Sequence, residues 1–122
     1  MAIGIHADPD TAVEEMDALV DVHAAVQRHW NTDNIVIMGD LNADCSYASG
    51  RARERLLLRN DPQFIWLIDD DVDTTVTNSD CAYDRCAPAI VTLTCILART
   101  YFLSFMRTQC RTDGRTRRKP VT

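Results

Sequence analysis

Ile35-Val36-Ile37-Met38-Gly39-Asp40-Leu41-Asn42-Ala43-Asp44 is the stretch that decides the fold of this 122-residue chain. Its first half is an uninterrupted apolar run, which is typical of a buried strand. Its second half is an acidic loop with an amide side chain. Magnesium prefers oxygen ligands and often uses one or two carboxylates. The loop therefore predicts either metal-assisted cleavage of a phosphoester or a turn in which Asp40 and Asn42 bond only local backbone.

Strand-like and helix-like segments alternate around this stretch. Residues 3–6 and 35–38 are predicted strands, and residues 64–68 indicate another buried strand because they lack polar alternation. Residues 51–58 suggest a short basic helix, and residues 90–96 suggest a further strand. This alternation predicts an α/β fold, built as two layers or as a sandwich.

One amphipathic helix is predicted for residues 11–29, where apolar side chains recur at helical spacing before a polar stop. Thr11 and Glu14 have the spacing of a capping box, in which Thr11 accepts an early backbone N–H and Glu14 reaches back. His23 falls on the apolar stripe. We expect it to be a core or edge histidine and not a ligand.

The charge of the chain is unevenly divided. The formal net charge is −5, but residues 1–106 contain 7 Lys/Arg against 17 Asp/Glu, and residues 107–122 contain 6 against 1. An acidic body is unusual for a nucleic-acid binder, although bound divalent cations would reverse the local field in a metal-dependent nuclease. We expect the basic end to be a solvated, disordered tail. A nucleic-acid arm or localisation signal is the alternative.

Two segments bear on the compartment. Residues 87–106 are the most apolar stretch, but Pro88 and Arg99 interrupt them, so we do not expect a membrane span. The segment that begins at Met1 lacks the basic start, apolar core and cleavage site of a secretory signal peptide.

The chain has five cysteines, so at least one is unpaired or pairs between chains. Cys45 follows the acidic loop, and Cys81 precedes Tyr83 and Asp84. A bridge between these cysteines would tie the two loops together and stabilise the fold by roughly 4 kcal/mol on the chain-entropy view. Two reduced, buried thiols are the alternative, expected in the cytosol.

Four segments in this order resemble the deoxyribonuclease I family, part of the larger endonuclease/exonuclease/phosphatase superfamily. They are His6, Gly39-Asp-Leu-Asn-Ala-Asp-Cys-Ser-Tyr47, Asp73-Thr-Thr-Val-Thr77 and Cys81-Ala-Tyr-Asp-Arg85. The resemblance implies that residues 1–86 form part of a four-layer α/β/β/α sandwich. A divergent apolar segment (87–106) and the basic tail (107–122) would follow.

The resemblance also implies an endonuclease that hydrolyses the phosphodiester bonds of DNA with Mg²⁺ and Ca²⁺. The implied catalytic residues are His6, Asp40, Asn42 and Asp84, of which Asp40 and Asp84 are also the expected magnesium ligands. The implied DNA contacts are Asn42, Tyr47 and Tyr83, although either tyrosine could simply pack at the surface.

A calcium site and a disulfide are implied as well. The calcium residues would be Asp73, Thr75, Thr77 and Ser79, with a plain β-turn as the alternative. The bridge would be the Cys45–Cys81 pair considered above. Members of the family are typically secreted, so the resemblance implies an extracellular protein despite the lack of a visible signal peptide.

The chain departs from the family in two places. We find no counterpart of the metal-binding Glu residues of the family's N-terminal half, and Ser79-Asp80 is followed by Cys81 and not by the His of the closing Ser-Asp-His motif. We therefore expect a truncated chain with weak or no activity, because catalytic groups that act together lose most of the rate when one is missing.

Truncation would also leave a sheet face unpaired, and this face could bind a protein partner. The alternative function is accordingly that of a non-catalytic paralogue that binds DNA, calcium or a protein. A phosphatase or phosphodiesterase acting on small substrates is a weaker alternative, because the 73–77 and 81–85 motifs favour the deoxyribonuclease branch.

Overall fold

The computed structural model describes residues 1–89. Within them the elements follow the order β1 (Ala2–His6), α1 (Ala12–Trp30), β2 (Val36–Asp40), α2 (Gly50–Arg53), α3 (Leu57–Asn60) and β3 (Asp84–Pro88). The strands form one sheet in the order β1-β2-β3, with β1 parallel and β3 antiparallel to β2. The predicted α/β class is confirmed.

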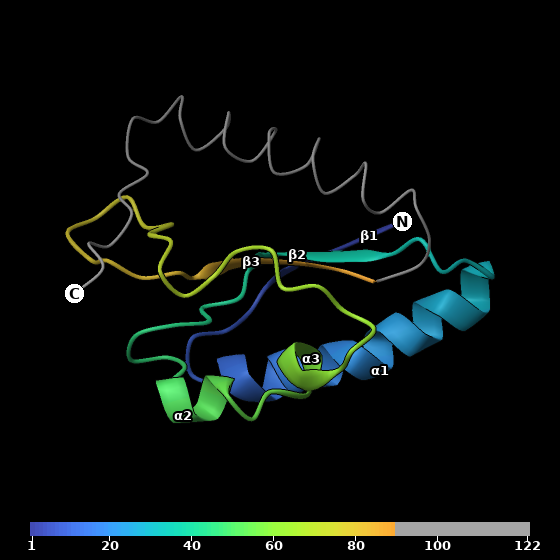
Figure 1. Cartoon of the computed structure of the whole chain (residues 1–122), viewed down its shortest axis with the longest axis horizontal. Coiled ribbons are helices and arrows are strands. Elements are labelled where there is room, and N and C mark those ends of the chain that lie inside the picture. The colour runs from blue at the N-terminus through green and yellow to red at the C-terminus, as the bar shows by residue number, and fades with distance from the viewer. Residues whose placement is uncertain (90–122) are drawn as a thin grey trace.

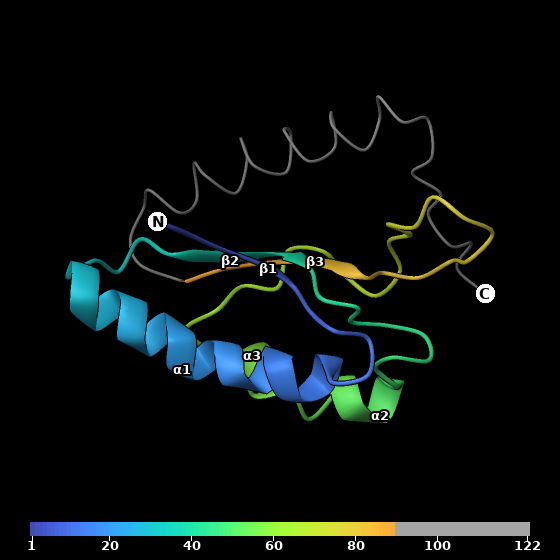
Figure 2. The same ribbon diagram turned by 180° about the vertical axis from the view of Figure 1, so that it is seen from behind.

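The helices lie on one side of the sheet, and α1 runs along that face (Figures 1 and 2). Successive side chains of a strand point to opposite faces, so Ile3, Ile5 and Ile37 all point toward α1. There they join one apolar core with Met16 and Leu19 of the helix. The alternate residues of each strand are left to face away from α1.

Helix α1 matches the predicted range to within one residue, but the predicted capping box is wrong. Thr11 makes no side-chain cap hydrogen bond; its hydroxyl donates to Oε1 of Glu15 at 2.8 Å. The N–H of Asp8 donates to the same oxygen at 3.1 Å. Glu15, and not Glu14, therefore ties the start of the helix to the loop after β1.

Strand β2 continues two residues beyond the predicted end, to Asp40. The predicted basic helix at 51–58 is divided into the short helices α2 and α3. The predicted strand at 90–96 lies outside the described residues. Within residues 1–89, no helix is long and apolar enough to span a membrane, and most of the apolar segment 87–106 also lies outside the described range.

Residues 64–68 do not form the predicted regular strand. Phe64 makes only an isolated bridge with Ala89. The N–H groups of Ile65 and Leu67 donate to the carbonyls of β3 residues Pro88 and Cys86, each at 2.9 Å. The segment thus runs along the outer edge of β3 without regular pairing, and its apolar pattern reflects partial burial there and not a strand.

Gly39 is needed where β2 passes β1. Its φ is +144°, and a Cβ at this position would lie 1.9 Å from the carbonyl oxygen of Ile5. Only glycine permits that backbone conformation and so close an approach. The glycine that precedes Asp40 in the acidic motif therefore allows the ends of β1 and β2 to lie together.

Candidate active site

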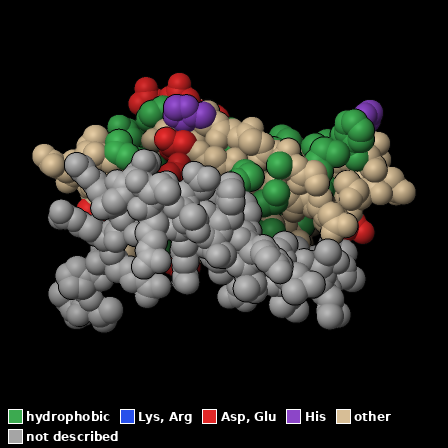
Figure 3. Space-filling view, turned by 90° about the horizontal axis from the view of Figure 1, so that it is seen from above, with side chains coloured by type: hydrophobic (Ala, Val, Ile, Leu, Met, Phe, Trp, Pro, Cys, Tyr) green, Lys and Arg blue, Asp and Glu red, His purple; other side chains and the backbone are tan. Residues whose placement is uncertain are grey.

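His6, Asp40 and Asp84 lie in one row across the sheet. The strand register pairs His6 with Asp40, and Asp40 with Asp84. Residues directly opposite one another on neighbouring strands share a face, so all three project from the face that points away from α1. Figure 3, which views the molecule from that side, shows a histidine beside acidic side chains. The three residues assigned to catalysis from separate motifs thus converge.

The pair formed by His6 and Asp40 is open to water. His6 Nε2 lies 3.7 Å from Asp40 Oδ2, with the two side chains 76% and 41% exposed. An exposed pair of this kind contributes little to stability. The other oxygen, Asp40 Oδ1, accepts the N–H of Asn42 at 3.0 Å. The carboxylate of Asp40 therefore both stabilises the loop that follows β2 and faces the imidazole of His6.

Asp84 has the most perturbed environment of the row. Burial raises the pKa of its carboxyl, and the negative charge of Asp40 raises it further. A hydrogen bond with Thr74 and the charges of Arg85 and His6 act in the opposite direction. Two neighbouring carboxylates repel one another, and a divalent cation between them would relieve that repulsion.

Asn42 is largely buried, with 5% of its surface exposed. Its backbone is left-handed, with φ +47°, a conformation that Asn adopts more readily than most residues. Its Nδ2 donates to the carbonyl of Ala7 at 2.9 Å, across 35 residues of sequence. The structure thus shows Asn42 joining the loops that follow β1 and β2, next to the predicted catalytic row.

Tyr47 and Tyr83 form a pair of aromatic rings beside the row. Their ring centroids are 5.4 Å apart, and the rings are tilted by 41°. Tyr47 is exposed and Tyr83 is half-buried. Burial raises the pKa of Tyr83, and so do Tyr47 and the carboxylates of Asp44 and Asp40. The two residues predicted to contact DNA therefore share one surface.

The predicted disulfide between Cys45 and Cys81 is present, with a Cα–Cα distance of 5.9 Å. It joins the loop after β2 to the segment before β3, and each tyrosine of the pair lies two residues beyond one of its cysteines. Cys86 is free and buried, and burial raises the pKa of its thiol to about 12. A thiol of that kind is inert as a nucleophile.

The four residues predicted to bind calcium lie in one compact loop. Asp73 Oδ1 accepts the N–H and the hydroxyl of Thr75 at 2.9 and 2.6 Å, and the oxygen of that hydroxyl also lies 2.5 Å from the carbonyl oxygen of Ser79. The hydroxyls of Thr77 and Ser79 are 3.0 Å apart. Calcium takes six to eight oxygen ligands, and the loop gathers carboxylate, hydroxyl and carbonyl oxygens of the required kinds.

The described residues offer fewer ligands to a magnesium ion. Within residues 1–89 no group of three or more His, Cys, Asp or Glu side chains is placed to hold a metal ion. Asp40 and Asp84 supply two carboxylates in adjacent register. Magnesium commonly binds through one or two carboxylates and completes its shell with water and substrate phosphates. The donor set fits that mode of binding.

A buried charge network supports the site, and sequence analysis missed it. Asp44 Oδ1 lies 2.6 Å from Arg53 Nη1, with both side chains largely buried. Asp44 Oδ2 accepts the N–H of Ala82 at 2.9 Å. The carboxylate therefore joins α2 to both loops that carry the predicted catalytic residues.

Asp70 forms ion pairs with three arginines. Arg53 Nε, Arg59 Nη1 and Arg85 Nη2 lie 3.2, 2.9 and 2.8 Å from its carboxylate. Burial alone would raise the pKa of Asp70, but the hydrogen bond from Arg59 and the charges of the three guanidinium groups lower it overall. The network thus extends from the loop after β2 to α3 and β3.

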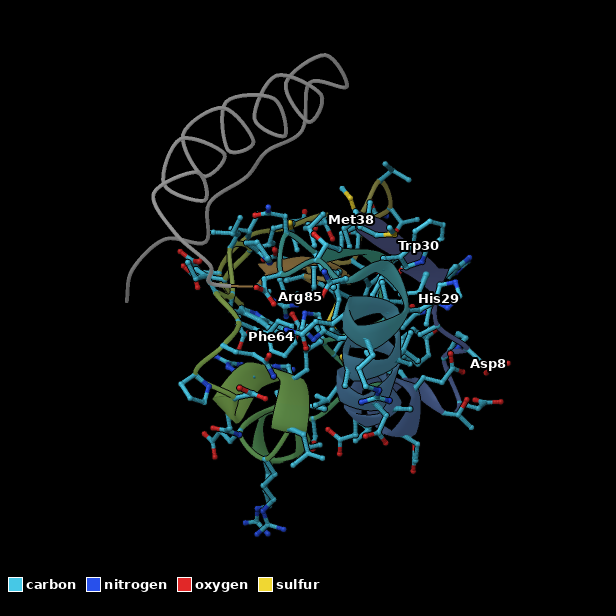
Figure 4. All side chains as sticks on the ribbon, turned by 90° about the vertical axis from the view of Figure 1, so that its right-hand side faces the viewer. Asp8, His29, Trp30, Met38, Phe64 and Arg85 are labelled. Atoms are coloured by element: carbon cyan, nitrogen blue, oxygen red, sulfur yellow. A yellow bond between two sulfur atoms is a disulfide. The ribbon has the colours of Figure 1, made fainter. Side chains whose placement is uncertain are left out.

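Arg85 is the most enclosed member of this network. Its side chain lies between the sheet and the helices, as does that of Phe64, whereas Asp8, His29 and Trp30 lie at the outside (Figure 4). It donates to the carbonyls of Ile68 at 2.7 Å and of Ala43 at 2.9 Å. The only signal in the sequence was the position of this arginine directly after Asp84 in the same strand. Successive residues of a strand face opposite sides of the sheet, so an arginine there faces the core.

Comparison with known proteins places the chain in a family. A profile of the endonuclease/exonuclease/phosphatase family matches residues 3–118. The chain is 50% identical over 84 residues to deoxyribonuclease gamma of Mus musculus, 52% over 83 residues to deoxyribonuclease-1-like 2 of Homo sapiens, and 49% over 83 residues to deoxyribonuclease-1 of Canis lupus familiaris.

Each of these matches covers 68% of the chain, but only 27%, 28% and 29% of the respective relative. The chain thus spans less than a third of the length of the curated relatives it matches. The similarity therefore bears on part of this chain and on a minor part of each relative, and not on the whole of a relative.

Proposed function

Since the chain belongs to the endonuclease/exonuclease/phosphatase family, in its deoxyribonuclease I branch, we propose that it contributes the His6–Asp40–Asp84 row to a site that hydrolyses phosphodiester bonds of DNA. The observation that carries this proposal is the strand register, which places the three side chains side by side on one face. The names of the relatives supply the substrate class, DNA.

The described residues have distinct parts in the proposed reaction. Histidine ordinarily exchanges protons near neutral pH, so the exposed imidazole of His6 serves as the proton donor or acceptor for the phosphoester. Asp40, whose Oδ2 lies 3.7 Å from Nε2 of His6, orients that imidazole. Asn42 supports the loop and has a second amide N–H with which to contact a phosphate oxygen.

Asp40 and Asp84 would hold a magnesium ion, which supplies positive charge to stabilise the developing charge on phosphate oxygens. The raised pKa of Asp84 fits this role, because both of its causes, burial and the charge of Asp40, are those a cation would offset. Tyr47 and Tyr83 would contact the DNA backbone beside the row.

Three finer properties belong to the same proposal. Asp73, Thr75, Thr77 and Ser79 would bind a structural calcium ion through the oxygens gathered in their loop. The three-stranded sheet would form part of a four-layer α/β/β/α sandwich, in which the face that points away from α1 would pack on a partner sheet or protein. A secreted location would suit the disulfide, because such bonds persist in oxidising compartments.

A non-catalytic binding role is the second candidate. It is favoured by the openness of His6 and by the presence of only two carboxylates in the row. A site of this composition could bind DNA and cations without turnover, which would agree with the weak activity expected from the sequence.

Nicking of supercoiled plasmid in Mg²⁺ and Ca²⁺ separates the two candidates. We expect nicking that His6→Ala reduces at least a hundredfold, as for loss of a general acid or base, and that the control His29→Ala leaves unchanged. Equal nicking by wild type and His6→Ala would refute the assignment. Metal-dependent DNA binding without nicking would establish the second candidate instead.

A further inference from the structure

Thr74 bonds outward from the loop of residues 73–79, whereas its neighbours bond to one another. The N–H of Asp84 donates to Thr74 Oγ1 at 3.0 Å. The N–H of Thr74 donates to the carbonyl of Cys81 at 3.0 Å, and its hydroxyl lies 3.4 Å from the same oxygen. Thr74 therefore bonds to both ends of the segment of residues 81–84, which includes Tyr83 and Asp84.

The bond to the N–H of Asp84 has a geometric consequence. The N–H and Cα–Cβ directions of a residue differ by a rotation about its N–Cα bond, and the pairing of β3 with β2 holds that rotation in the range of a strand at Asp84. An acceptor that fixes the N–H of Asp84 therefore also fixes the direction in which its carboxylate leaves β3. Asp84 is the first residue of that strand, where the register with Asp40 begins. A shift of this N–H would misplace the carboxylate relative to Asp40 and His6.

The opposite side of Thr74 is held by the loop. Asp73 Oδ1 accepts both the N–H and the hydroxyl of Thr75, so the residues on each side of Thr74 are tied to one another. The hydroxyl of Thr75 also reaches the carbonyl of Ser79. Order within the loop thus fixes the backbone from which the Thr74 hydroxyl projects.

We propose that Thr74 is a positioning residue, which transmits the order of the 73–79 loop to Asp84 through its hydroxyl. Its relevance to catalysis rests on the function proposed above. The side chains of Asp73, Thr75, Thr77 and Ser79 form hydrogen bonds within the loop. The side chain of Thr74 instead bonds to Asp84, a member of the row. A threonine in the motif thereby acquires a role distinct from that of its neighbours.

Amide hydrogen exchange of Asp84 tests the link without any need for nuclease activity. Thr74→Val keeps the shape and removes the hydroxyl, so exchange at Asp84 should become about fivefold faster, as for the loss of one net hydrogen bond. Thr74→Ser should restore the wild-type rate. The matched control Thr32→Val lies outside the loop and the row, where the hydroxyl accepts the N–H of Asn34, and it should leave the rate within twofold.

A double-mutant cycle tests the transmission itself. Asp73→Asn, which weakens the bonds to Thr75, should speed exchange at Asp84 in the wild type and add nothing in the Thr74→Val background. Equal effects of Asp73→Asn in the two backgrounds would overturn the proposal. So would an unchanged exchange rate at Asp84 in Thr74→Val.

Plasmid nicking supplies the catalytic readout. Thr74→Val should lower kcat about tenfold and leave KM for DNA unchanged, because misplaced groups slow the reaction step, and Thr74→Ser should restore kcat. An equal loss of kcat in both variants, or a change in KM alone, would contradict a positioning role. Failure of the wild type to nick DNA would count against the proposed function, and the exchange cycle would then decide the link by itself.

Discussion

The carboxylate of Asp44 accepts the backbone N–H of Ala82 at 2.9 Å, across 38 residues of sequence. The same side chain forms a buried ion pair with Arg53. Together these contacts join the two loops that frame the proposed site. The arrangement of the proposed site therefore depends on buried polar contacts made by residues outside the row of His6, Asp40 and Asp84.

Removal of the Asp44 carboxylate should be costly. Asp44→Ala leaves Arg53 with an incomplete set of partners and the N–H of Ala82 without its acceptor, so we expect a loss of about 3 kcal/mol. Urea denaturation measures it. Asp71→Ala, at an exposed neighbour of Asp70, is the control and should change stability by less than about 0.5 kcal/mol. Equal effects would show that the network contributes nothing special.

Gly39→Ala should disrupt the approach of β1 to β2. A Cβ there would meet the carbonyl of Ile5 at 1.9 Å, and φ is positive, so a loss of about 3 kcal/mol or more is expected. Gly4→Ala is a matched control, because nothing lies within 4 Å of its Cβ position. Denaturation midpoints of the two variants should differ clearly. Similar midpoints would mean that the close approach is wrong.

The Cys45–Cys81 bridge should make stability depend on reductant. Closing a loop of this length contributes about 4 kcal/mol on the chain-entropy view, so dithiothreitol should lower the melting temperature of the wild type. The double variant Cys45→Ser/Cys81→Ser should melt low with or without dithiothreitol. A wild type indifferent to the reductant would contradict a structural role for the bond.

Acid should destabilise the fold through His23. The side chain is 2% exposed and its ring packs edge-on against Phe64. Burial lowers the pKa of His23, an effect only partly opposed by the charges of Asp61 and Asp33. The unfolded chain, with a pKa near 6.5, therefore binds the proton more readily than the folded one. This contribution is present above pH 6.5 and is lost as the pH falls below it.

Stability measured between pH 7.5 and pH 5 checks this prediction. His23→Leu should flatten that part of the profile, because no proton is taken up at the site on unfolding. His29→Gln, at the exposed end of α1, should keep the slope of the wild type. A slope that survives in His23→Leu would assign the acid sensitivity to other groups.

The sequence was most informative where a residue's neighbours along the chain determine its structure. The periodic apolar residues predicted α1, and the apolar run before Asp40 predicted β2. The resemblance led to the row of His6, Asp40 and Asp84, because its motifs are contiguous and ordered. The disulfide between Cys45 and Cys81 followed from the same source and is present.

The missed features depend on partners that are distant in sequence. Arg85 contacts Ala43 and Ile68, which are 42 and 17 residues away, and nothing in local periodicity identifies such partners. The capping box failed because Thr11 and Asp8 both bond to Glu15, one residue beyond the expected Glu14. The irregular path of residues 64–68 was missed because apolar runs report burial and not regular pairing.

The most direct test of the central claim uses Mn²⁺ in place of Mg²⁺ and follows paramagnetic broadening by NMR. Convergence of the three side chains on one metal site predicts that the His6 ring and the backbone amides of Asp40 and Asp84 broaden together, and that Asp40→Asn weakens all three effects. Broadening confined to the acidic start of α1 around Glu14 and Glu15, with the row unaffected, would contradict the account.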